Sequence, residues 1–364
     1  MIRRTSPPER RWWRVTPFAV VLAAVAMAGC GSSSGFSSPA GSGGSGDPPG
    51  SGQTLTLYNA QHEETTATLI KAFTEQTGIK VRVKSDDESV LTAQIEQEGS
   101  RSPADVFFTE NSNWLQQLDD RGLLAKVNPS TLADVPAEDN ASNGDWAGVS
   151  GRFSVMIYNP SKISAAEMPR SVMDLASPRY KGKLELAPGE TDFWPIVTSI
   201  EHAKGQAAAL NWLKAIKSNA GSDDHTPDNE TLVSDVSKGD ADMGLINHYY
   251  YYRLRDEMGA ANFHAKLSLF APRDPGYVED VSGAGVLKSS KNQAAAQRFL
   301  AFLTSVAGQR VLAGSTSFEY PLAKGVVANP ALPPIDTYEP NPITPEQIGT
   351  GTDAEELLQQ AGLL

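Results

Sequence analysis

Alternation of strand and helix patterns is the feature that most restricts how this chain can fold. Residues 55–59 alternate as a strand does, residues 63–77 carry apolar side chains at helical spacing, and residues 79–83 alternate again. A second helical pattern over residues 88–98 leads into the apolar run 104–108. This β-α-β-α-β order predicts an α/β fold with a mostly parallel sheet, helices on its faces, and ligand sites beyond the carboxyl ends of the strands.

A second set of such patterns follows later in the chain. It predicts strands over residues 184–187 and 243–247 and helices over residues 193–203, 206–217 and 231–238. From Ser282 a strand-like segment and the helix 292–303 indicate a return to the first set. We therefore expect two α/β lobes with a cleft between them. The lobes are expected to comprise residues 53–152 plus 280–330, and residues 153–279 plus 331–364.

The N-terminus has the composition of an export signal. Five arginines precede the apolar run 18–29, which is too short for a membrane-spanning helix but suits a signal-peptide core. Small residues before Cys30 are typical of a bacterial lipoprotein processing site, so residues 1–29 are expected to be removed and Cys30 to carry lipid. A plain signal peptide with an incidental cysteine is the alternative. Residues 30–52 are rich in Gly, Ser and Pro, which predicts a flexible linker to a lipid anchor at the outer face of the cell membrane.

Charge and cysteine content exclude several classes of function. Residues 53–364 carry 26 basic and 41 acidic residues, and this net charge of −15 argues against a nucleic-acid partner. Cys30 is the only cysteine, so the folded part can have no disulfide, iron–sulfur cluster or thiolate zinc site. Any metal there must be bound by oxygen and imidazole donors.

Four polar side chains lie two or three residues beyond the ends of predicted strands: His62, Glu110, Tyr249 and Tyr250. Taken singly, His62 could be a surface or cap residue, and Glu110 could simply open the next helix. The four consecutive tyrosines 249–252 are unusual, because a helix that buries one stripe needs aromatic residues at three- or four-residue spacing. Arg253 and Arg255, which follow, are expected on a solvent-exposed helix face.

This donor combination suits a hard trivalent cation. Ferric iron prefers oxygen donors and can displace phenol protons, which otherwise leave only near pH 10. One carboxylate and two phenolates would supply three negative charges, and a neutral imidazole adds a donor without charge. Calcium would favour carboxylates and carbonyls, magnesium would keep its waters, and zinc would not need the phenolates. Four such ligands would leave two octahedral positions open.

Six segments of the chain closely resemble the ferric-ion-binding proteins of bacterial ABC importers. They are residues 58–62, 98–107, 245–250, 273–276, 286–290 and 319–322, in the family's order, and the resemblance covers essentially all of residues 53–364. It implies the type II periplasmic-binding-protein fold, in which two lobes close on a hinge around the ligand. It also implies that His62, Glu110, Tyr249 and Tyr250 match the family's iron ligands.

The same resemblance implies a function and its partners. The protein is expected to be a monomeric extracytoplasmic solute-binding protein and not an enzyme. It would capture Fe³⁺ in the cleft between its lobes and deliver it to a membrane permease with its ATPase.

One segment departs from the family's pattern. Phosphate-using members have a small Ser-Gly-Ala-type turn whose backbone N–H groups hold a synergistic anion, whereas this chain has Glu190, Thr191 and Asp192 there. Two carboxylates would repel phosphate, so Glu190 or Asp192 is expected to complete the coordination directly or through bound water. Alternatively, both acids cap the following helix. Three further residues match the family's anion-contacting amides and cleft arginine: Asn229, Asn247 and Arg152. Whether an added anion takes part therefore stays open.

Three other functions account for parts of the pattern. The same fold could bind a small organic solute or a ferric chelate, with the tyrosines as a stacking platform. An extracellular metallohydrolase is a second possibility, since residues 62–66 begin like a zinc-protease motif, but the motif's second histidine is missing. A passive surface adhesin would explain the lipid and the linker and would leave the four donors without a role.

Overall fold

The structure, a computed structural model, describes residues 52–220 and 226–364. The expected signal peptide, Cys30 and all of the linker except Gly52 lie outside the described residues. The strands are β1 (Thr54–Ala60), β2 (Lys80–Ser85), β3 (Val106–Thr109), β4 (Leu124–Ala125), β5 (Ala147–Tyr158), β6 (Leu184–Glu185), β7 (Met243–Asn247), β8 (Lys266–Ser268), β9 (Glu279–Leu287) and β10 (Tyr320–Pro321). The helices are α1 (Glu63–Thr77), α2 (Glu88–Glu98), α3 (Ser112–Asp120), α4 (Pro129–Leu132), α5 (Trp194–Lys204), α6 (Gln206–Asn219), α7 (Asn229–Lys238), α8 (His248–Met258), α9 (Gln293–Thr304), α10 (Val306–Ala313), α11 (Pro345–Ile348) and α12 (Thr352–Ala361).

The first part of the chain folds as its periodicity predicts. β1 pairs in parallel with β2 on one side and with β3 on the other, and α1 and α2 make the two connections. The apolar stripe of α1 is buried, with the Phe73 ring 5.0 Å from that of Phe299 on α9. α1 ends at Gly78, whose φ of 72° lies in the left-handed region that glycine adopts without strain.

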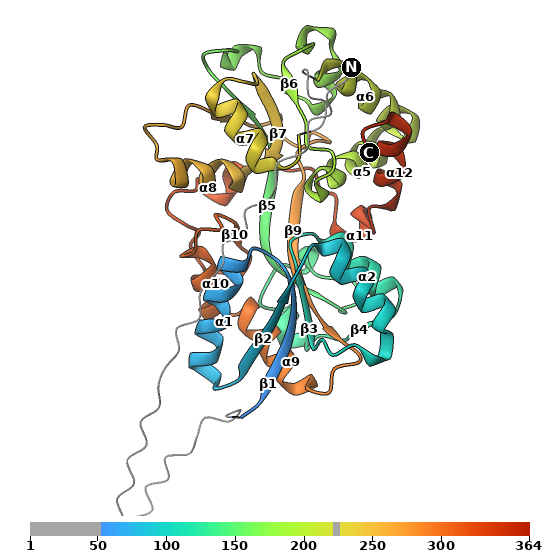
Figure 1. Cartoon of the computed structure of the whole chain (residues 1–364), viewed down its shortest axis with the longest axis vertical. Coiled ribbons are helices and arrows are strands. Elements are labelled where there is room, and N and C mark those ends of the chain that lie inside the picture. The colour runs from blue at the N-terminus through green and yellow to red at the C-terminus, as the bar shows by residue number, and fades with distance from the viewer. Residues whose placement is uncertain (1–51, 221–225) are drawn as a thin grey trace, which may run out of the picture. The chain divides into compact units, whose positions relative to one another are not determined.

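Two long strands join the two parts of the sheet. β9 pairs antiparallel with β3 and with the first half of β5, whereas β5 from Ser154 onward pairs antiparallel with β7 and β8. Figure 1 shows β5 and β9 side by side, running from the β1–β3 region toward β7. The main strand order is β2-β1-β3-β9-β5-β7-β6. We call β1–β4, β10 and the paired parts of β5 and β9 the first half of the sheet, and β6–β8 with the end of β5 the second half.

The prediction of a mostly parallel sheet is wrong for the strands that join the halves. The parallel pairs are β1 with β2, β1 with β3, and β6 with β7, and the joining strands β5 and β9 pair antiparallel. β5 was not predicted because all twelve of its residues are buried, so it lacks the alternation that marks a half-exposed strand. The wider prediction of an α/β fold with helices flanking the sheet is confirmed.

In the described part of the chain, no helix combines the length and the apolar character needed to cross a membrane.

Candidate metal centre

A cavity of about 590 Å³ lies beyond the carboxyl ends of β1 and β3. His62 and Glu110, which follow these strands, line one side of it. Glu190 and Asp192, from the loop between β6 and α5, line it as well, together with Tyr250 from α8. The cavity therefore lies where a ligand site was expected, beyond the carboxyl ends of strands, and residues from both halves of the sheet line it.

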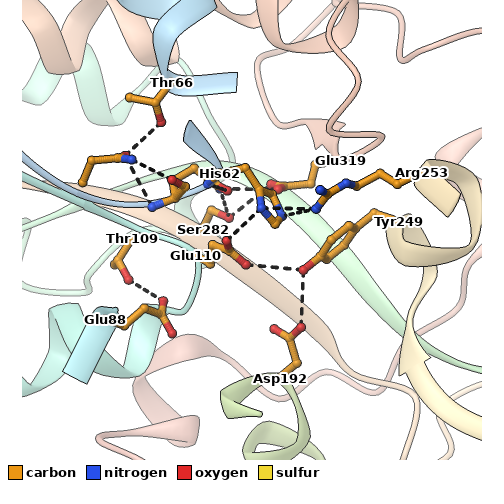
Figure 2. A network of polar contacts seen from close by, with 12 residues as sticks. His62, Thr66, Glu88, Thr109, Glu110, Asp192, Tyr249, Arg253, Ser282 and Glu319 are labelled. Atoms are coloured by element: carbon orange, nitrogen blue, oxygen red, sulfur yellow. Dashed lines mark hydrogen bonds and ion pairs between the residues drawn. The ribbon is translucent and has the colours of Figure 1, made fainter. Parts of the chain in front are cut away.

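His62 is held in place through its own backbone. It occupies the position before α1, and its N–H donates a 2.7 Å hydrogen bond to the side-chain oxygen of Gln61. The Gln61 amide in turn donates to Ser282 at 3.0 Å and to Glu319 at 3.3 Å. A buried set of polar contacts between segments more than 200 residues apart in the sequence thus orients the start of α1 (Figure 2).

His62 and Glu110 face each other, with Nδ1 of His62 3.3 Å from Oε1 of Glu110 (Figure 2). Burial lowers the pKa of His62 to about 3, and the nearby guanidinium groups of Arg253 and Arg152 contribute to that shift. The imidazole is therefore neutral, as a metal ligand must be. Burial raises the pKa of Glu110 well above its usual range, and the neighbouring Asp192 carboxylate adds to this effect.

The two tyrosines enter the site from the first turn of α8, directly after β7. Both are buried, and their rings stack with centroids 4.1 Å apart. The Tyr249 hydroxyl donates to Oε2 of Glu110 at 3.3 Å and to Oδ2 of Asp192 at 3.4 Å. The Tyr250 hydroxyl donates to the same Asp192 oxygen at 2.9 Å. Burial, followed by the negative charge of Asp192, raises the pKa of each phenol well above its usual range.

Asp192 is the meeting point of these contacts. Its side chain is buried, and its Oδ2 accepts from both phenols and from the Asn229 amide at 3.4 Å. Its Oδ1 accepts no hydrogen bond and lies 3.4 Å from a guanidinium nitrogen of Arg152. Glu190 stands at the start of the short 3₁₀ turn Thr191–Phe193 and makes no capping hydrogen bond. These contacts favour a role in the site over the helix-capping alternative.

Arg152 is fully buried and its charge is already balanced. It lies 3.1 Å from Asp280 and donates to Ser282 at 2.8 Å and to Asn111 at 2.6 Å. Thr191 lies at the edge of the same network, where its hydroxyl donates to Glu88 at 2.7 Å. Arg152 therefore braces the floor of the site, and little of its charge is free for an added anion.

Four of the sequence-predicted residues do not line the cavity: Arg152, Asn229 and Tyr249, which contact Asp192 from behind the wall, and Asn247. Asn247 makes no such contact. It is buried before the first turn of α8, and its side-chain amide nitrogen has no hydrogen-bond partner in the described structure. Asn229, by contrast, contacts Asp192 directly. Of the two amides matched to anion contacts, one is therefore already occupied by a carboxylate of the chain itself.

The expectation that Arg253 lies on a solvated helix face is wrong. Its Nη1 lies 3.2 Å from Nδ1 and 3.0 Å from Nε2 of His62, and it is 3.7 Å from a Glu230 oxygen (Figure 2). Its spacing in the sequence could have predicted this position. Arg253 lies four residues after Tyr249 and therefore on the same face of α8. Arg255, two residues further on, is exposed as expected.

The donor set fits ferric iron as a bound substrate. It comprises two phenols, two carboxylates and one neutral imidazole, linked by contacts that run from His62 through Glu110 and Tyr249 to Asp192 and Tyr250. Within residues 52–220 and 226–364 no three His, Cys, Asp or Glu side chains form a metal-binding group by themselves. A metal site here therefore depends on the tyrosines, which is the choice that a hard trivalent cation favours over zinc or calcium.

Comparison with known proteins agrees with this chemistry. A family model described as bacterial extracellular solute-binding protein matches residues 59–310. The Fe(3+)-binding periplasmic protein of Serratia marcescens is 39% identical over 312 residues, which cover 86% of this chain and 91% of the relative. The chain belongs to the bacterial extracellular solute-binding proteins.

One further relative and two solved structures are also similar to this chain. The major ferric iron-binding protein of Neisseria gonorrhoeae is 37% identical, over 85% of this chain and 93% of the relative. The crystal structure of iron-bound HitA from Pseudomonas aeruginosa has a TM-score of 0.81 and 41% identity, over 85% of this chain and 99% of that one. A Trichodesmium protein in complex with iron and citrate has a TM-score of 0.75 and 28% identity, over 85% and 99%. The family resemblance inferred from the sequence is confirmed, and with it the two-lobe fold.

Proposed function

We propose that this protein captures Fe³⁺ in its cavity and delivers it to the permease and ATPase of an ABC importer. One observation carries the proposal: two buried phenols donate to a shared carboxylate within reach of a second carboxylate and a neutral imidazole. Stacking of an organic solute would not need that arrangement. The ferric-iron names of the relatives support it independently.

The proposed iron ligands are His62, Glu110, Tyr249 and Tyr250. In the metal-free site the phenols keep their protons, because burial and the Asp192 carboxylate raise the pKa of both. Binding of iron displaces those protons and turns each phenol into an anionic ligand. The neutral imidazole can bind without first losing a proton, since the pKa of His62 is lowered to about 3.

Asp192 is proposed to take the role that an added anion has in phosphate-using relatives. Its Oδ2 already accepts from both phenols and from Asn229. Glu190 lines the same side of the cavity and is the second carboxylate able to hold iron-bound water. A phosphate in that place would be repelled by the negative charge of Asp192, whereas Glu190, whose pKa burial raises to about 8, is mostly uncharged at neutral pH.

Release is proposed to follow opening of the lobes at the strands that join them. We place the lobes at residues 53–152 plus 280–330 and 153–279 plus 331–364. His62 and Glu110 then belong to one lobe and the tyrosines to the other, so opening pulls the ligand set apart. We further propose that the protein acts as a monomer, tethered through a lipid on Cys30 after removal of residues 1–29.

A visible absorption spectrum tests the proposed ligand set. The purified protein, stripped of metal, is titrated with ferric ion in phosphate-free buffer beside Tyr249→Phe and Tyr250→Phe. We expect a red-orange phenolate-to-iron band that saturates at one equivalent and weakens in both variants. A band only after phosphate is added would keep iron binding and overturn the role of Asp192. The absence of a band under either condition would contradict iron binding and favour an organic solute.

A further inference from the structure

Arg253 places a permanent positive charge against one of the proposed metal ligands. Its Nη1 lies 3.0 Å from Nε2 and 3.2 Å from Nδ1 of His62, so it reaches both ring nitrogens (Figure 2). The side chain comes from the second turn of α8 and is only 15% exposed. Arg253 does not itself line the cavity, so it contacts the site through His62.

This contact covers the lone pair with which His62 would bind a metal. A neutral imidazole has one nitrogen that carries a proton and one that carries a lone pair, and a guanidinium group has donors only. Because Nη1 is within hydrogen-bond distance of both ring nitrogens, it faces the lone pair whichever nitrogen carries it. A metal ion can therefore bind His62 only after the guanidinium has moved away.

Glu230 offers the displaced guanidinium a second partner. It lies in the first turn of α7, lines the cavity, and has a carboxylate oxygen 3.7 Å from Nη1 of Arg253. A shift of the guanidinium toward Glu230 would free His62 and would keep the positive charge beside the site. Arg152 has no such second partner to move to, because it is fully buried and is already engaged by the carboxylates of Asp280 and Asp192.

A positive charge beside the site does not affect all metal ions equally. Phenols lose their protons only near pH 10, so Tyr249 and Tyr250 carry protons before loading. Fe³⁺ that displaces both protons raises the charge of the site by one, whereas Zn²⁺, which does not need phenolate ligands, raises it by two. Zinc also depends more on His62, since imidazole is one of its preferred donors. Arg253 therefore opposes zinc more strongly than iron.

We propose that Arg253 is a positioning residue that sets the metal selectivity of the site. It covers the lone pair of His62 in the metal-free protein, moves to Glu230 on loading, and disfavours divalent cations relative to Fe³⁺. This inference rests on the proposed function and narrows the substrate class to a trivalent cation that can displace phenol protons.

Matched variants on α8 test the inference. Arg253→Leu removes the charge and the donor, Arg253→Lys keeps both, and Arg255→Leu removes an exposed charge two residues further on as the control. Competition with a chelator of known affinity for each ion measures the binding of Fe³⁺ and Zn²⁺. Nitrogen NMR of the metal-free protein with labelled histidine follows the ring of His62, whose signals are assigned by their loss in His62→Ala.

We expect Arg253→Leu to bind Zn²⁺ at least about 10-fold more tightly than the unmodified protein, and Fe³⁺ no more than about 3-fold more tightly. Arg253→Lys should retain most of the preference for iron. Arg255→Leu should change neither affinity by more than about 2-fold, because its charge is exposed and screened. The resonance of the unprotonated His62 nitrogen should shift in Arg253→Leu and stay in place in Arg255→Leu.

Three results would contradict the inference. Equal gains for the two ions in Arg253→Leu would overturn the selectivity assigned to Arg253, and so would an equally large effect in Arg255→Leu. An unchanged nitrogen resonance in Arg253→Leu would show that the guanidinium does not cover the lone pair. The proposed function fails by a different result, since it is contradicted if the unmodified protein gives no ferric-phenolate band.

Discussion

The hydroxyl of Tyr250 donates a 2.9 Å hydrogen bond to Oδ2 of Asp192, the same oxygen that lies 3.4 Å from the hydroxyl of Tyr249. One carboxylate oxygen of the chain thus faces both phenols of the proposed ligand set. An anion supplied from solution would have to displace it.

Replacing Asp192 should create a need for an added anion. We expect the unmodified protein to bind iron in phosphate-free buffer with no gain on adding phosphate. We expect Asp192→Ala to bind at least about 10-fold more weakly and to recover in part when phosphate fills the space. Competition with a chelator of known affinity measures both, and Asp256→Ala, an exposed aspartate of α8 outside the cavity wall, is the matched control. A steep gain of affinity with phosphate in the unmodified protein would contradict the assigned role of Asp192.

Iron loading should release protons. Burial and the Asp192 charge raise the pKa of Tyr249 and Tyr250 well above its usual range, so both phenols are protonated at neutral pH before loading. Each phenolate ligand formed therefore costs one proton, and iron affinity should fall as the pH falls. Calorimetry in buffers of different ionisation enthalpy counts the protons, and Tyr250→Phe should lower the count by about one. Loading without proton release would rule out phenolate ligation.

His248 should contribute strongly to stability. It is fully buried; its Nδ1 accepts from the N–H of Phe153 at 3.1 Å, and its Nε2 lies 3.0 Å from the Phe318 carbonyl oxygen. Replacing it with Phe leaves a buried donor and a buried acceptor unpaired, which should cost about 2–4 kcal/mol in the free energy of unfolding. Denaturant unfolding of the metal-free protein measures this cost. The exposed His202→Phe should change stability by no more than about 0.5 kcal/mol, and equal effects of the two variants would refute the prediction.

Glu279, at the start of β9, should make the metal-free protein less stable as the pH rises. Burial, with Asp139 nearby, raises the pKa of Glu279 from 4.5 to about 8. The folded state then holds a proton that the unfolded chain has already lost, so this contribution is complete below about pH 4.5 and is lost as the pH rises through 8.

A glutamine in place of Glu279 tests this dependence. We expect Glu279→Gln to flatten the fall in stability between pH 5 and pH 8 and to gain at least about 1 kcal/mol at pH 8. Unfolding midpoints across that range, beside the exposed Glu75→Gln as control, measure the change. An unchanged slope in the Glu279 variant would show that other buried carboxyl groups set it.

Local patterns predicted many of the elements closely. The bounds of α1 and α2 are those read from periodicity, because each helix buries one stripe and ends at a glycine. β5 was not predicted from the sequence, because it is buried along its whole length and its residues do not alternate between apolar and polar. β5 pairs antiparallel with β7 and β9, whose paired residues lie 85 or more positions away in the sequence, and this pairing makes the sheet mixed and not mostly parallel.

The sequence by itself determined which residues follow the strand ends. His62, Glu110, Tyr249 and Tyr250 could be grouped because a strand's end and the residue after it are local properties, and the carboxyl ends of strands in such folds open on the same cleft. The two phenols, the carboxylate and the imidazole of these residues predict a ferric-iron site from the sequence alone. Cysteine content and charge limited the alternatives in the same way, since neither depends on how the chain folds.

Only the tertiary structure decided what the neighbouring charges do. The sequence did not distinguish the role of Glu190 from that of Asp192. In the structure, only the Asp192 carboxylate contacts Tyr249 and Tyr250, which lie 57 and 58 positions later in the chain. The sequence likewise predicted Arg253 as a surface residue, whereas in the structure it contacts His62, which lies 191 positions earlier in the chain. Contacts over such distances depend on how the two halves of the sheet pack together, and that packing is not encoded in any local pattern.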